Sequence, residues 1–134
     1  MEMIALDTNI LVRLLVKDDD EQSRIVFKRF KTAEKNNETL FIPLLVVLEL
    51  ILVLNSVYDC GREEVVSAIE KLTMMPIIRF EKLEVIHELI KYGKNTSIDF
   101  SDLLICNSAI FSGCKKVITF DKNASKYQSF VLLK

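Results

Sequence analysis

The sequence predicts an α/β fold of three layers, α/β/α, in which helices cover both faces of a central, mostly parallel sheet. Short apolar runs of strand length alternate along the chain with longer segments whose apolar residues recur at helical spacing. Such alternation is typical of parallel sheets covered on both faces. The 134 residues suit one hydrophobic core, so we expect residues 1–134 to form a single domain.

Five short apolar segments are expected to be strands, at residues 3–6, 40–42, 77–80, 116–120 and 130–133. The first strand begins at once, without the basic leader of a signal peptide. Asp7 follows this strand and Asp121 follows the fourth. Because α/β sheets bind ligands beyond the carboxyl ends of their strands, both aspartates are candidate site residues.

Six helices are expected, at residues 9–16, 21–35, 44–58, 62–72, 83–92 and 99–111. Three aspartates before the second helix can cap it, and its apolar stripe should comprise Ile25, Val26, Phe27 and Phe30. The third helix is apolar on nearly every side. We therefore expect it to be central in the fold, with Gly61 closing it.

Composition limits the environment and the partners. Half of the residues are hydrophobic and the mean hydropathy is +0.26, so either a partner covers apolar surface or the core is well filled. The net charge of −1 gives no indication of a nucleic-acid partner, so any RNA contact must use a local basic patch. Three cysteines without a zinc or disulfide pattern, and an apolar stretch too short to span a membrane, predict a soluble cytoplasmic protein.

The carboxylate of Glu49 stands out because it interrupts the apolar run of residues 44–54. A buried carboxylate is costly unless it is paired or bound to a metal. No lysine or arginine occurs between Lys35 and Arg62, so no local partner is offered. Glu49 is thus either a functional acid, a partner in a core ion pair, or a side chain that reaches the surface.

Other acids have a structural and a functional interpretation. Asp7, taken alone, fits a helix cap better than a site residue, and Asn9 fits a turn or a support for a carboxylate. Asp99 and Asp102 are three residues apart and share a helix face, although a cap and a first-turn charge would also explain them.

Asp121 ends a strand, where a turn residue is common, and the hydroxyl of Thr119 either reaches the site or belongs to an ordinary strand residue. Carboxylates gathered without lysine need a cation, and hard oxygen ligands suit Mg²⁺ or Mn²⁺ rather than zinc. The lone histidine, His87, lies in a charged helix and is expected to be solvated.

Four segments, in the right order, resemble the motifs of the PIN-domain ribonuclease family. They are LDTNILVRLL at residues 6–15, VVLEL at 46–50, DFSDLLICNSA at 99–109 and VITFD at 117–121. The resemblance spans nearly the whole chain, and the length suits a VapC-like toxin of a toxin–antitoxin pair. The sequence departs from the family after Asp121, where KNASK stands in place of a further acid and an aromatic residue.

The resemblance implies a role for each matching residue. The catalytic and metal-binding quartet would be Asp7, Glu49, Asp102 and Asp121. Asp99 would be an accessory acid, and Asn9 and Thr119 would be supporting residues.

The resemblance also implies an activity, which is hydrolysis of RNA phosphodiester bonds with one or two Mg²⁺ or Mn²⁺ ions. A homodimer and an antitoxin protein are the partners it implies. The alternatives are a housekeeping PIN nuclease in RNA processing and a catalytically silent binding module. Candidate RNA-binding cations lie shortly after the aspartates of the first and fourth strands, namely Arg13, Lys17, Lys122 and Lys126. For any one of them, ordinary solvated surface charge is the favoured alternative.

Overall fold

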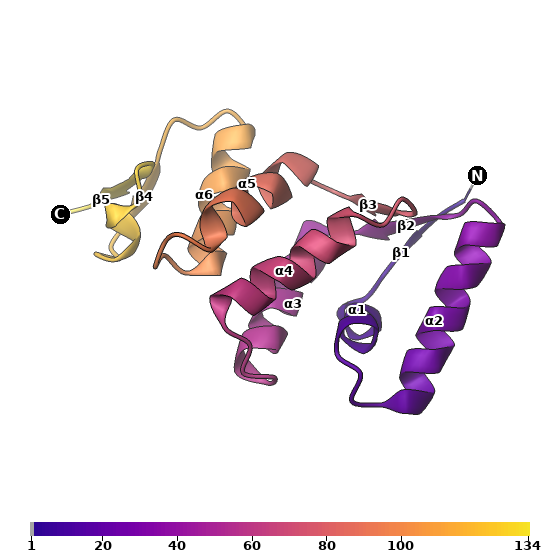
Figure 1. Ribbon diagram of the computed structural model, residues 1–134. Coiled ribbons are helices and arrows are strands. Elements are labelled where there is room, and N and C mark those ends of the chain that lie inside the picture. Colours follow the sequence, from indigo (N-terminus) through magenta and orange to yellow (C-terminus); the bar gives the residue numbers. More distant parts are fainter. Residues whose placement is uncertain (1) are drawn as a thin grey trace. The chain divides into compact units, whose positions relative to one another are not determined.

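The computed structural model describes residues 2–134 as two compact units, shown in Figure 1. The first unit ends at Glu81 and the second spans Lys82–Lys134. Each unit contains a parallel sheet and helices, and each is described by itself below. The prediction of an α/β fold with parallel strands flanked by helices is confirmed.

The first unit is built on a parallel sheet of three strands in the order β1-β2-β3. The strands are β1 (Met3–Ala5), β2 (Thr39–Ile42) and β3 (Ile78–Phe80), and Leu40 is paired with Ile4 on one side and Ile78 on the other. Two helices connect β1 to β2, namely α1 (Thr8–Leu15) and α2 (Asp20–Lys35). Two more connect β2 to β3, namely α3 (Leu44–Ser56) and α4 (Arg62–Thr73). Leu40 and Ile42 lie on one face of the middle strand and are almost fully buried.

α2 begins at Asp20, one residue before the predicted start, and its apolar stripe is only partly as predicted. The Asp19 carboxylate accepts a hydrogen bond of 3.0 Å from the backbone N–H of Gln22 and caps the helix. The buried face comprises Val26, Phe30 and Ala33. The prediction was wrong for Ile25 and Phe27, which are 61% and 59% exposed. Each neighbours Val26 in the chain and is therefore rotated from it by about 100° around the helix axis.

The prediction that α3 is central on all sides was wrong. One face is buried and comprises Val47, Leu50, Ile51 and Leu54. The opposite face is exposed, with Leu45 at 78% and Leu52 at 53%. Gly61 does not close α3 either, since the chain turns at Asp59, whose φ is +57°, and Gly61 instead precedes α4 as its N-cap.

The second unit contains α5 (Leu83–Gly93), α6 (Phe100–Phe111), β4 (Val117–Thr119), the short 3₁₀ helix η1 (Ala124–Lys126) and β5 (Phe130–Leu132). The strands β4 and β5 pair in parallel, with Ile118 opposite Val131. The helices α5 and α6 pack together, and their buried leucines include Leu89 and Leu103. Gly113 follows the end of α6 with a φ of +104°, a backbone conformation that favours glycine.

None of the helices in the described residues is long and apolar enough to cross a membrane.

Candidate acidic site

Asp7 lies where β1 ends and α1 begins. Its Oδ1 atom accepts a hydrogen bond of 2.8 Å from the backbone N–H of Thr8, so the carboxylate occupies the N-cap position of α1. The Asp7 side chain is exposed. The capping interpretation is therefore confirmed, and one hydrogen bond leaves the remaining oxygen lone pairs able to bind a ligand. Asn9 is exposed in the first turn of the same helix.

Glu49 lies beside this helix start, because Thr8 connects the two elements. The buried Thr8 hydroxyl donates a hydrogen bond to Oε1 of Glu49 in the middle of α3. Glu49 itself is exposed, so the prediction of a desolvated carboxylate was wrong, and so was the alternative of a core ion pair. Its side chain reaches the surface, which is compatible with a role as a functional acid.

Thr8 is the residue that sequence reasoning missed. Its position directly after Asp7 suggested nothing beyond an ordinary first turn. Its spacing from the apolar Leu11 and Val12 could have indicated burial, because the three residues share one helical face. All three are buried. A buried hydroxyl needs a hydrogen-bond partner, and the carboxylate of Glu49 supplies it.

Thr8→Val should destabilise the fold, because the isosteric methyl group keeps the packing and removes the donor to Glu49. We expect a loss of about 1 kcal/mol in unfolding free energy, a typical value for one hydrogen bond. Thr8→Ser should retain most of the stability, since it keeps the hydroxyl. Thermal and urea denaturation of the three proteins test this, and equal stability of the valine and serine variants would show that the hydrogen bond contributes nothing.

In the second unit, Asp99 and Asp121 each lie within electrostatic range of Asp102. Asp99 precedes α6 as its N-cap residue without a side-chain capping bond, and Asp102 lies in the first turn. Burial raises the pKa of the Asp102 carboxyl, and the charges of Asp99 and Asp121 raise it further. Asp102 therefore lies where its negative charge is disfavoured by its surroundings.

Asp121 shapes the loop that follows β4. Its Oδ1 accepts hydrogen bonds from the backbone N–H groups of Asn123, at 2.8 Å, and Ala124, at 3.3 Å. Its own backbone N–H donates to Oγ1 of Thr119 at 3.0 Å. The turn interpretation of Asp121 is confirmed. The Thr119 hydroxyl accepts a hydrogen bond from the backbone of Asp121 and so helps to fix the position of that residue.

A small cavity adjoins this loop. Its volume is ≈ 290 Å³, and Oγ1 of Thr96 is buried without a hydrogen-bond partner in the part of the chain that the structure describes. The segment KNASK, which departs from the family pattern, supplies part of the wall. The lining residues are Thr96, Ser97, Ile98, Asn123, Lys126 and Tyr127.

The donor atoms fit a hard divalent cation better than zinc. They are carboxylate oxygens, and His87 is exposed on α5, as predicted. The repulsion that raises the pKa of Asp102 is of the kind that a bound cation relieves. Within residues 2–134, no three His, Cys, Asp or Glu side chains are gathered as a metal site, and Asp7 and Glu49 belong to a different unit from Asp102 and Asp121.

The sequence matches the PIN domain family over residues 4–129, a stretch that includes all seven predicted site residues and runs through both units. The chain therefore belongs to the PIN domain family. It is similar to a VapC ribonuclease of Aquifex aeolicus (strain VF5), with 27% identity over 124 residues that cover 92% of this chain and 91% of that protein. The resemblance inferred from the four motifs is confirmed.

Proposed function

We propose that this protein is a metal-dependent endoribonuclease that hydrolyses RNA phosphodiester bonds in the cytoplasm, and that it is the toxin of a toxin–antitoxin pair. The observation that carries the proposal is the grouping of the predicted acids within each unit. Thr8 joins Asp7 to Glu49 in the first unit, and Asp102 interacts with Asp99 and Asp121 in the second. The similarity to a protein named as a VapC ribonuclease supports the same activity.

The acids would divide the work of binding metal and activating water, with the chain acting as one PIN domain. Asp7 and Asp102 are our choice for direct metal ligands, and Glu49 and Asp121 would complete the set directly or through water. Bound Mg²⁺ or Mn²⁺ supplies Lewis acidity, which activates water and neutralises charge on the phosphate. Asp99 would add negative charge beside Asp102, and Asn9 would support the carboxylates near it.

Two threonines would hold the acids in position. The Thr8 hydroxyl restricts the Glu49 carboxylate, and the Thr119 hydroxyl restricts the backbone of Asp121. Groups that orient metal ligands in this way commonly change metal affinity or activity by about 10- to 100-fold when removed. On this proposal, Thr8→Val loses cleavage as well as stability, and Thr8→Ser largely retains both.

Metal removal tests the proposed activity. Purified protein should cleave single-stranded RNA in Mg²⁺ or Mn²⁺, lose cleavage in EDTA, and regain it when either metal is restored. Asp7→Asn protein, purified in parallel, is the control for a contaminating ribonuclease and should stay inactive with metal present. Full cleavage by the wild type in chelator would contradict the metal mechanism.

The proposed partners are an antitoxin protein and a second copy of the chain. Apolar side chains on the surface of the first unit support such contacts, because soluble proteins seldom leave large apolar side chains exposed together. Leu45 and Leu52 on α3 are the clearest examples, being seven residues apart and therefore on one helical face.

A further inference from the structure

One face of α2 carries a row of cations with an aromatic ring beside it. Arg24, Lys28, Lys31 and Lys35 are spaced four, three and four residues apart, which places them on one side of the helix, and all four are exposed. The ring of Phe27 is 59% exposed, and the ammonium of Lys31 lies 5.3 Å from its centroid.

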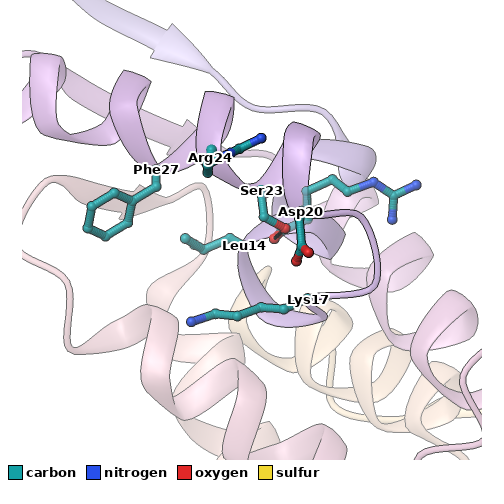
Figure 2. A pocket seen from close by; sticks show the side chains of 7 residues that line it. Leu14, Lys17, Asp20, Ser23, Arg24 and Phe27 are labelled. Atoms are coloured by element: carbon teal, nitrogen blue, oxygen red, sulfur yellow. Dashed lines mark hydrogen bonds between the residues drawn. The ribbon is translucent and has the colours of Figure 1, made fainter.

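A groove lies between this face and the carboxyl end of α1. Its volume is ≈ 500 Å³, and Figure 2 shows Leu14 and Lys17 extending toward the side on which the Phe27 ring lies. The residues that line the groove are Arg13, Leu14, Lys17, Asp20, Ser23, Arg24 and Phe27. The groove therefore combines cations, an apolar side chain and an exposed aromatic ring in one surface.

The charges of this surface are unevenly matched. Arg13 forms an ion pair of 3.0 Å with Asp18 and a hydrogen bond with Tyr58. No ion pair engages Lys17 or Arg24 within residues 2–134, and the same holds for the other cations of the row. Asp20 is the only acid in the groove lining. An anionic ligand would therefore meet mainly unpaired cations here, although the whole chain has a net charge of −1.

A solvated helix face explains the cations but not Phe27. Covering this large apolar ring with a ligand would gain free energy, since the core contact of α2 is already made by Val26, Phe30 and Ala33. A flat ring flanked by cations is the combination that binds single-stranded nucleic acid, in which bases stack on aromatic side chains and phosphates contact Lys and Arg.

We propose that this groove binds single-stranded RNA, with a base stacked on Phe27 and phosphates held by Lys17, Arg24 and the lysines of α2. The inference rests on the proposed function, because the strand bound here is the strand to be cut. Leu14 lies seven residues after Asp7, or about 10 Å along α1. That separation matches about three nucleotides of a stacked strand, so the groove would hold the substrate a few nucleotides from the Asp7 carboxylate.

Fluorescence anisotropy of a labelled single-stranded RNA, measured in EDTA to prevent cleavage, tests the stacking contact. Phe27→Ala should weaken binding about fivefold or more, the lower range for loss of one stacked base. Ile25→Ala is the matched control, since Ile25 is 61% exposed on the same helix and does not line the groove. Equal affinities of the wild type and Phe27→Ala would overturn the inference, as would equal affinity for a duplex of the same sequence.

The salt dependence of binding tests the cations. The double variant Arg24→Gln and Lys31→Gln should reduce the slope of log affinity against log salt by about 1.4, since each phosphate contact to a single strand contributes about 0.7. Lys71→Gln combined with Lys82→Gln removes the same charge from exposed positions elsewhere and should leave the slope unchanged. A slope that both double variants share with the wild type would overturn the assignment.

Cleavage assays separate this inference from the proposed function. If the wild type cleaves RNA in Mg²⁺ and Phe27→Ala both binds and cleaves as the wild type does, the groove inference fails and the nuclease stands. If the wild type binds RNA through Phe27 and the cations but never cleaves it, the groove inference stands and the nuclease fails.

Discussion

Asp102→Asn should unfold at a higher temperature than the wild type at neutral pH, while its RNA cleavage falls by roughly 100-fold or more, beyond the loss typical of a residue that only orients a ligand. The gain in stability follows from the raised pKa of Asp102, which shows that burial and the charges of Asp99 and Asp121 oppose its ionisation in the folded protein. The gain should be about 1 kcal/mol or less, because solvent partly screens the repulsion at a half-buried group. The helix dipole favours a negative charge in the first turn, which limits the expected gain.

The stability difference between Asp102→Asn and the wild type should depend on pH. A carboxyl whose pKa is higher in the folded state than in the unfolded state costs stability once the pH is above both values. That cost disappears as the pH falls below the ordinary pKa of an aspartate, where both states are protonated. The advantage of Asp102→Asn over the wild type should therefore be present at neutral pH and shrink toward zero in acid.

Asp99→Asn provides the matched control, because it removes one of the two neighbouring charges and leaves Asp102 in place. On the Asp99→Asn background, Asp102→Asn should stabilise the protein less than it does on the wild type. The repulsion between the two carboxylates is already absent from the Asp99→Asn protein. Denaturation of the four proteins at two pH values measures this. A lower melting temperature for Asp102→Asn at neutral pH would mean that its charge stabilises the fold.

The order and type of the elements could be predicted from the sequence because apolar periodicity and turn residues both mark them. The start of α2 at Asp20, directly after the capping Asp19, is an example. The environment of α3 could not be predicted, because a helix apolar on all sides gives no indication of which face its neighbours cover. Leu45 and Leu50 are indistinguishable in the sequence, yet one is 78% exposed and the other is fully buried.

The acids of the candidate site could be found from the sequence, but not all of their surroundings. Asp121 and Thr119 are close in the chain, so a local turn could be foreseen. The hydrogen bond from Thr8 to Glu49 joins residues 41 positions apart, and only the packing of α1 on α3 creates it. The error about Glu49 has the same origin, since burial on a helix depends on tertiary contacts and not on the residues beside it.

The RNA groove escaped prediction for a related reason. Arg13 and Lys17 were predicted as RNA contacts because they follow Asp7, whereas no role was predicted for the cations of α2. Phe27 was assigned to the core stripe, which removed the aromatic residue that makes this face unusual. Its exposure became apparent only when the packing of Val26 and Phe30 fixed the rotation of the helix.

Induced expression of the wild-type protein alone should arrest the growth of a bacterial host, and Asp7→Asn should not. The amide keeps the size of the side chain and its ability to accept the hydrogen bond from the Thr8 N–H, so the cap of α1 should survive. It loses the negative charge that holds a hard cation, so cleavage should be lost. Growth arrest by the wild type with normal growth of Asp7→Asn would tie the harm to the chemistry of this carboxylate.

Growth curves, soluble protein levels and sequenced RNA ends should be measured together in the two strains. The wild type should generate new RNA ends that Asp7→Asn does not, and those ends would identify the target. Co-expression of a short regulator encoded beside the gene should restore growth, as expected for an antitoxin. Soluble wild-type protein that leaves growth unchanged would favour a housekeeping nuclease or a binding module. Equal arrest by both proteins would mean that the harm does not come from metal-assisted cleavage, because the substitution removes the charge on which that chemistry depends.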